Sequence, residues 1–174
     1  MCPQDMLTAA LRDWDGASAT ALRAIYQQHH TEPDFTPALV AACQAPDTES
    51  AATWLIKHQC EIGGAAFLPE MCATVYAMLP KFTHWAARLH ILQCVDHLPI
   101  PQTVADTVLS FVTHEATSTQ KLIRAWSLYA AAQLAVQHPR YQSDAQALLA
   151  AAADPAPTGA VAVRLRKARA LLNV

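Results

Sequence analysis

Glycine is scarce in this sequence, with four glycines against eleven prolines in 174 residues. Gly63-Gly64 is the only adjacent pair, so the chain cannot supply the glycine-rich turn of a phosphate-binding loop or a dinucleotide fingerprint. Gly-x-Ser-x-Gly and His-Glu-x-x-His motifs are also missing, and no spacing marks a pair of carboxylates as catalytic. The sequence therefore predicts a protein that is not an enzyme and that uses no cofactor.

Long apolar runs are missing as well. One of the longest, residues 147–153, is mostly alanine and falls well short of the ~18 residues that a membrane-spanning helix needs. The first five residues, Met-Cys-Pro-Gln-Asp, contain no basic region followed by an apolar one. We therefore expect no secretory signal and no association with a membrane.

The cysteines lack the spacing of a metal or redox motif. They are odd in number, form no Cys-x-x-Cys pair, and three of them lie inside apolar helical patterns. The five cysteines are Cys2, Cys43, Cys60, Cys72 and Cys94. In a chain without an export signal, these features indicate reduced thiols that pack as small core residues. The expected location is the cytoplasm.

Composition predicts a folded protein, because 53% of the residues are hydrophobic and 15% are charged. A unit of this length hides roughly 70% of the surface that its unfolded form exposes, and we expect residues 1–174 to form a single domain.

The formal net charge is −2, yet before residue 160 eight cations face fourteen acids, giving −6. Such an acidic body is a poor surface for duplex DNA, because phosphate contacts dominate that affinity.

What the sequence does contain is an internal period. Pro37, Pro69 and Pro101 are equally spaced, and each opens an apolar helical pattern. Proline suits a first helical turn, since its missing N–H would have no partner there. Pro3 begins a similar pattern at nearly the same distance before Pro37. Further matches follow at a wider, constant step: Ala105 with Ala145, Lys81 with Lys121, Gln93 with Gln133, and Pro99 with Pro139.

Polar links between these segments predict ten helices that pair as five antiparallel hairpins, in an all-α protein. The first helices of the hairpins are expected at about residues 3–11, 35–45, 68–79, 101–114 and 141–153. The second helices are expected at about residues 18–29, 49–61, 82–97, 119–137 and 160–172. Because one hairpin cannot bury its own apolar face, neighbouring hairpins must stack around a continuous, elongated core.

Residues 36–56 combine an apolar first helix, a turn that carries Asp47 and an alanine-rich second helix. This pattern resembles the HEAT-like family of α-solenoids. Ile123-Arg124-Ala125 and Val163-Arg164-Leu165 are similar to the Val-Arg start of that family's second helix. The step between the equally spaced prolines is nearer to the period of tetratricopeptide repeats, but their Trp-x-x-Leu-Gly-x-x-Tyr pattern is missing. The resemblance implies an α–α superhelix that binds protein on a curved surface more often than it catalyses a reaction.

Basic side chains fall near the starts of three second helices, where His84, Arg124 and Arg164 are equally spaced. In a solenoid they would line up as a positive ridge for an acidic partner segment or a phosphate, extended by Lys57, Lys81, Arg88 and Lys121. The alternative is structural: the resemblance implies that Arg124 and Arg164 hydrogen-bond acids in the turns, with Glu115 and Asp154 as the candidates.

Tryptophan occurs early in three second helices, as Trp54, Trp85 and Trp126. Aromatic residues at helical spacing are often core, but on an open groove they are good anchors for a partner. We expect an interaction module or scaffold that binds another protein along its second helices, with Trp85 and Trp126 as anchors; self-association through a flank or an end is also open. The alternative is a nucleic-acid-binding protein that uses the basic C-terminal helix, residues 164–169.

One set of residues has the chemistry of a metal site. His90, Cys94 and His97 have i, i+4, i+7 spacing, and imidazole and thiolate are zinc ligands. However, Cys94 matches the apolar positions Cys60 and Leu134 in the repeat, and no fourth ligand is evident nearby. We therefore expect no metal, with these three residues as the candidates if one binds.

Overall fold

The computed structural model describes residues 3–174 of the chain, and within them all regular secondary structure is helical. The expected all-α class is therefore confirmed. The odd-numbered α-helices are α1 (Pro3–Arg12), α3 (Phe35–Ala42), α5 (Pro69–Ala77), α7 (Ala105–Glu115) and α9 (Gln142–Ala151). The even-numbered α-helices are α2 (Ala19–His29), α4 (Glu49–Glu61), α6 (Trp85–Leu92), α8 (Lys121–Gln137) and α10 (Gly159–Leu172). Short 3-10 helices, η1 (Gln102–Val104) and η2 (Pro139–Tyr141), precede α7 and α9.

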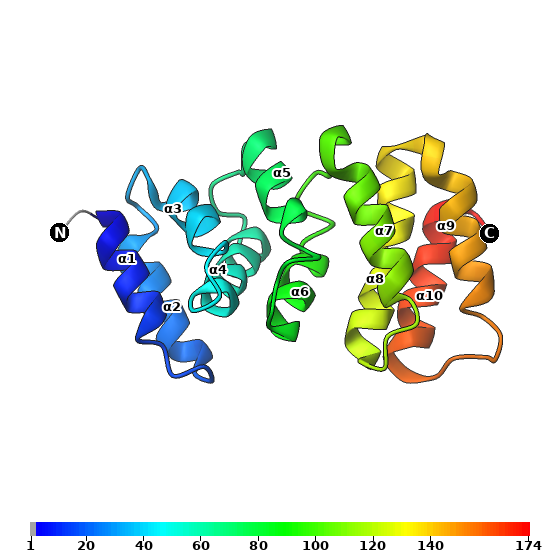
Figure 1. The fold of residues 1–174 in the computed structure, drawn as a ribbon, viewed down its shortest axis with the longest axis horizontal. Helices are drawn as coiled ribbons and strands as arrows, with labels where there is room; N and C mark the ends of the chain where they lie inside the picture. Colours follow the sequence, from blue (N-terminus) through cyan, green and yellow to red (C-terminus); the bar gives the residue numbers. More distant parts are fainter. Residues whose placement is uncertain (1–2) are drawn as a thin grey trace.

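The helices follow one another along an elongated molecule, from α1 at one end to α9 and α10 at the other (Figure 1). Contacts join α1 to α3, α3 to α5 and α5 to α7. A second series of contacts joins α2 to α4, α4 to α6, α6 to α8 and α8 to α10. A buried apolar cluster runs through the molecule from Leu7 in α1 to Leu172 in α10. No helix within residues 3–174 is both long and apolar enough to cross a membrane.

The prolines lie where the period predicts helix starts, although not all at the same position. Pro69 is the first residue of α5, Pro37 lies in the first turn of α3, and Pro101 is the N-cap of η1. Tyr141 was expected to open a helix, but Pro139 opens η2 just before α9. Each proline thus occupies a place where a backbone N–H is not needed for the helical ladder.

Helix α6 is shorter than expected, since it spans Trp85–Leu92 rather than about residues 82–97. At its start, the backbone N–H groups of Thr83 and His84 donate to the Glu49 carboxylate, which holds this segment outside the helix. At its end, the N–H groups of Cys94 and His97 bond to carbonyls three residues back, so the chain continues as tight turns. The contacts from Glu49 are long-range and cannot be deduced from the local pattern.

Alanine allows the helices to approach closely. Ala130, Ala131 and Ala132 in the middle of α8 are fully buried, as are Ala105 in α7 and Ala145 in α9. Small side chains at a helix contact permit interaxial distances near the lower end of the usual ~8–10 Å. Helices α8 and α10 are in extensive contact, and Ala168 of α10 is also fully buried.

Polar contacts also join residues that lie about one helix pair apart in the sequence. Such contacts span 33–37 positions, and they occur from one end of the molecule to the other: Arg12 with Asp47, Glu49 with Thr83, Thr53 with His90, Asp96 with Tyr129, Ile100 with Gln137, and Asp106 with Tyr141. Neighbouring helix pairs are therefore held by specific hydrogen bonds as well as by apolar packing.

Candidate functional site

Three tryptophans lie on three successive even-numbered helices. Trp85 is the first residue of α6 and is 45% exposed. Trp54 in α4 and Trp126 in α8 are half-buried and pack against the apolar core. The structure therefore leaves Trp85 as the tryptophan that is most open to a partner, whereas Trp54 and Trp126 have a structural role as well.

Arginines from neighbouring helices stack on two of these tryptophans. The guanidinium carbon of Arg164 in α10 lies 3.4 Å from the ring centroid of Trp126, and that of Arg23 in α2 lies 5.8 Å from Trp54. A guanidinium over an indole face is attracted by the ring quadrupole. The even-numbered helices thus present an arginine, three tryptophans and an arginine in chain order, which we call the tryptophan row: Arg23, Trp54, Trp85, Trp126 and Arg164.

His84 is occupied as a helix cap. Its Nδ1 accepts a hydrogen bond from the backbone N–H of Ala86, and its own backbone N–H donates to Glu49. The imidazole ring also stacks against Trp85, with ring centroids 6.2 Å apart. His84 therefore fixes the start of α6 and is not a free cation of a binding ridge.

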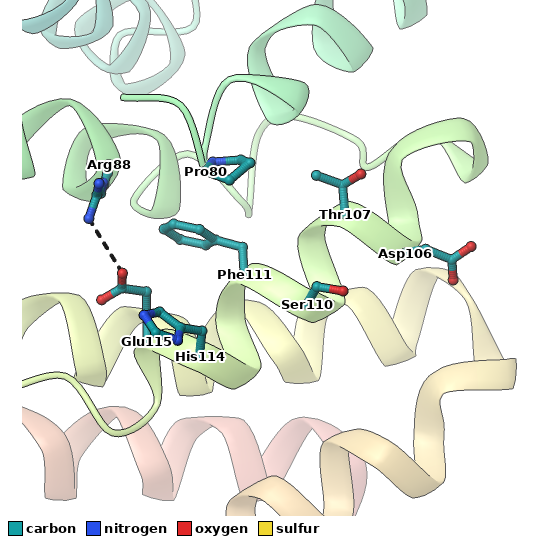
Figure 2. A pocket seen from close by; sticks show the side chains of 8 residues that line it. All are labelled: Pro80, Arg88, Asp106, Thr107, Ser110, Phe111, His114 and Glu115. Atoms are coloured by element: carbon teal, nitrogen blue, oxygen red, sulfur yellow. Dashed lines mark hydrogen bonds and ion pairs between the residues drawn. The ribbon is translucent and has the colours of Figure 1, made fainter. Parts of the chain in front are cut away.

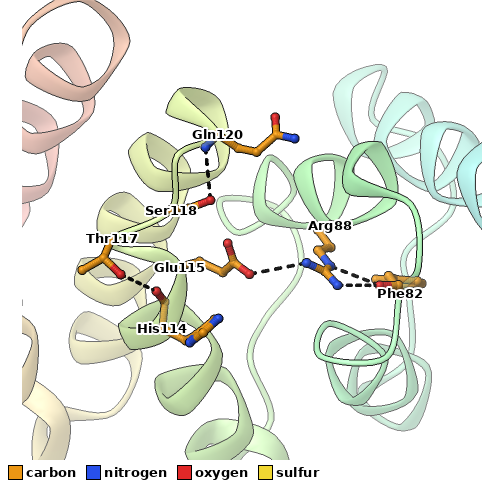
Figure 3. A network of polar contacts seen from close by, with 7 residues as sticks. All are labelled: Phe82, Arg88, His114, Glu115, Thr117, Ser118 and Gln120. Atoms are coloured by element: carbon orange, nitrogen blue, oxygen red, sulfur yellow. Dashed lines mark hydrogen bonds and ion pairs between the residues drawn. The ribbon is translucent and has the colours of Figure 1, made fainter.

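Arg88 is held in a polar network with Phe82 and Glu115 (Figure 3). Its Nε and Nη2 donate to the carbonyl oxygen of Phe82 at 3.1 and 2.8 Å, and its Nη1 lies 3.5 Å from the Glu115 carboxylate. Glu115, the last residue of α7, is buried. Arg88 therefore connects the segment before α6 to the end of α7 and is not free to bind a partner.

Beside this network lies a cleft of about 540 Å³. Figure 2 shows side chains from one face of α7 together with Arg88 and Pro80. In the described part of the chain no hydrogen bond joins Ser110 to His114, which is the nucleophile–base contact that acyl transfer uses. Sequence reasoning missed this cleft because its walls come from separate segments: Pro80, Arg88, Asp106, Thr107, Ser110, Phe111, His114 and Glu115.

Lys121 and Arg124 lie at the start of α8. Lys121 is exposed, whereas Arg124 is half-buried and lines a second cavity, of about 420 Å³, with Asp154. The expected pairing of Arg124 and Arg164 with turn acids is wrong. Within residues 3–174 neither arginine forms an ion pair, because Glu115 is held by Arg88 and Arg164 covers Trp126.

The three metal candidates are engaged in other contacts. The Nδ1 of His90 lies 3.1 Å from the hydroxyl of Thr53, and the Cys94 thiol donates to the His90 carbonyl oxygen. A hydrogen bond with Cys60, together with burial, raises the pKa of Cys94 well above its usual value, which disfavours the thiolate that zinc requires. Cys94 and His97 lie in the turns after α6, so the expected common helical face does not form. No three His, Cys, Asp or Glu side chains among residues 3–174 are placed to hold a metal ion.

Comparison with known proteins adds no relative: no family model, no curated protein and no solved structure matches this chain. The functional interpretation therefore depends on the tryptophan row, the charges around it and the two cavities.

Proposed function

We propose that this protein is a non-enzymatic interaction module that binds another protein along its even-numbered helices. In this proposal the chain is a HEAT-like α-solenoid of five stacked antiparallel hairpins. The two series of helix contacts and the hydrogen bonds between residues about one helix pair apart support that arrangement. The free thiols of Cys43, Cys60, Cys72 and Cys94 support a location in the cytoplasm, where cysteines stay reduced. Cys2 lies outside the residues that the structure describes.

The observation that carries the proposal is Trp85, which is 45% exposed between two helices that also present tryptophan. Tryptophan buries a large area at little cost in side-chain entropy and is enriched among the residues that dominate binding energy. Trp54 and Trp126 are fixed by Arg23 and Arg164. These side chains are preorganised, so they lose little freedom when a partner covers them.

Replacement of Trp85 by alanine tests the proposal. A protein that co-purifies with the chain from its native host should bind W85A about 30-fold more weakly in calorimetry, since a central tryptophan contributes about 2 kcal/mol or more. The matched control is Leu68→Ala, because Leu68 is 52% exposed but precedes α5, outside the tryptophan row. Equal affinity of W85A and the unchanged chain, with weaker binding by L68A, would place the partner elsewhere.

One observation favours a second candidate function, the binding of nucleic acid. Helix α10 contains four cations and no acid: Arg164, Arg166, Lys167 and Arg169. If the partner is a nucleic acid, its affinity should fall steeply with salt, and each cation removed from α10 should reduce that slope. A duplex oligonucleotide titrated at several salt concentrations distinguishes this function from protein binding.

A further inference from the structure

Positive charge is concentrated on the even-numbered helices. Nine of the twelve lysines and arginines lie in α2, α4, α6, α8 and α10, which contain two acids, Glu49 and Glu61. The odd-numbered helices contain five acids and one arginine, Arg12. The two sets of helices thus carry opposite charge in a chain whose net charge is only −2.

Helices α8 and α10 are the extreme case, since together they carry six cations and no acid: Lys121, Arg124, Arg164, Arg166, Lys167 and Arg169. Within residues 3–174 none of these six forms an ion pair, whereas four of the other six cations do: Arg12, Lys57, Arg88 and Arg140. The unpaired positive charge is therefore concentrated on α8 and α10.

Arg124 is the cation of this set with an unfilled hydrogen-bonding position beside a cavity. Its Nε is buried and has no acceptor, and a buried donor without an acceptor is unfavourable. The adjoining cavity of about 420 Å³ is lined by the hydroxyl-bearing Thr117 and Thr158, by Asp154, and by aliphatic side chains such as Leu148. A carboxylate on a short carbon stem fits this lining, because its oxygens can accept from the guanidinium and its stem can pack on the aliphatic wall.

We propose that α8, α10 and the connection before α10 form a docking site for an acidic segment of a partner protein, with a carboxylate of that segment bound by Arg124. The proposal rests on the proposed function and specifies the chemistry of the partner. The six unpaired cations supply the charge complementarity. Exposed Leu122 and Val163, on the same two helices, supply apolar contacts for the uncharged side chains of such a segment.

A nucleic acid fits this surface less well. Trp126 is covered by Arg164, so its face is not free to stack on a base. Since α8 and α10 contribute +6 to a net charge of −2, the rest of the chain carries −8 and repels a long polyphosphate. A short acidic peptide is confined to the positive region and avoids this repulsion.

The test uses a fluorescently labelled peptide that combines glutamates with leucines, titrated by anisotropy against the full chain. Arg124→Glu should weaken binding at least about tenfold, and Arg124→Lys should restore part of the loss, because lysine keeps the charge but not the planar fork. The matched control is Lys81→Glu, which makes the same change in charge at an exposed position between α5 and α6. It should alter affinity by less than about twofold.

Asp154 provides a second variant, since its carboxylate lines the same cavity. Asp154→Asn should tighten peptide binding about threefold by removing a negative charge from the rim. Equal peptide affinity of R124E and K81E would overturn the site. The site is also overturned if D154N and R124A lower the melting temperature by equal, non-additive amounts, because Arg124 then acts as a structural partner of Asp154. A duplex oligonucleotide that binds more tightly than the peptide and depends on the same residues also overturns it. A native partner that needs Trp85 but not Arg124 overturns this site and leaves the proposed function standing.

Discussion

The carboxylate of Glu49 in α4 holds the start of α6, which begins at Trp85. Its Oε1 accepts from the Thr83 N–H at 2.9 Å, from the Thr83 hydroxyl at 2.8 Å and from the His84 N–H. Glu49 itself is buried and lies in the first turn of α4. One side chain in α4 therefore determines where α6 begins, and the two helices also pack against each other.

Loss of this carboxylate should destabilise the fold. We expect Glu49→Ala to lower the free energy of unfolding by about 2 kcal/mol, because three donors lose a charged acceptor. The melting temperature of a chain of this size should fall by about 4–8 °C. Calorimetry checks this, with Glu61→Ala as the control. The side chain of Glu61 is 52% exposed and pairs with Lys57, so its loss should change stability by less than about 0.5 kcal/mol. Equal effects of the two variants would contradict the role of Glu49.

The pH dependence of stability should carry a contribution from His90. Burial, reinforced by the positive charges of Lys57 and His84, lowers the pKa of His90 from 6.5 to about 4. Between pH 6.5 and pH 4, His90 is protonated in the unfolded chain but neutral in the folded chain. The free energy of unfolding therefore decreases as the pH falls from 6.5 to 4. This contribution is absent above pH 6.5 and reaches about 3 kcal/mol at pH 4.

The variant His90→Gln isolates this effect. Burial also lowers the pKa of His58. The free energy of unfolding must therefore be compared between the variant and the unchanged chain at each pH, because the pH profile of one chain contains both histidines. Urea unfolding at several pH values should show a difference in stability that is constant above pH 7. As the pH falls from 6.5 to 4, the variant should gain stability relative to the unchanged chain. Parallel profiles over the whole range would show that His90 titrates normally.

Local pattern was sufficient to predict the class of fold and most helix positions. The boundaries of α4 were predicted at residues 49–61, as observed, because alanine-rich helical periodicity and the preceding turn are both local signals. The same reasoning placed α6 at residues 82–97 and was wrong at both ends. Glu49 holds the segment before α6 from a different helix, and long-range contacts of this kind leave no periodic signal in the sequence.

Buried thiols should resist alkylation in the folded protein. Burial raises the pKa of Cys43 to about 12, and the charge of Glu49 adds to this effect. At pH 8 the thiolate fraction of Cys43 is then about a thousandfold lower than that of an ordinary cysteine. Iodoacetamide labelling followed by peptide mass spectrometry should show Cys43 modified only in urea. Labelling of Cys43 at equal rates in buffer and in urea would contradict its burial.

The stacked pair of Arg164 and Trp126 should contribute to stability. We expect Arg164→Ala to cost about 1 kcal/mol, since the guanidinium lies 3.4 Å from the ring centroid and also 5.3 Å from that of Tyr129. Acrylamide quenching of tryptophan fluorescence should increase because the indole face becomes accessible. The control Lys167→Ala removes an exposed cation from the same helix and should leave both readouts unchanged.

The candidate site was predicted only in part. Tryptophan on successive second helices and the cations near their starts were visible in the sequence, but their environments were not. Arg88 turns to the Phe82 carbonyl and Glu115, and Arg164 covers Trp126. The contacts of a long basic side chain depend on which acceptor or ring lies nearest to it in three dimensions. The spacing of residues along one helix does not contain that information.

Hydrogen–deuterium exchange of the chain with and without its bound partner shows which helices the partner covers. The proposed function predicts slower amide exchange on binding in the even-numbered helices, strongest in residues 85–92 and 121–137 around Trp85 and Trp126. Amides of α3, α5 and α7 should exchange at unchanged rates. Protection confined to the odd-numbered helices, with no change in α6 and α8, would contradict the proposed function.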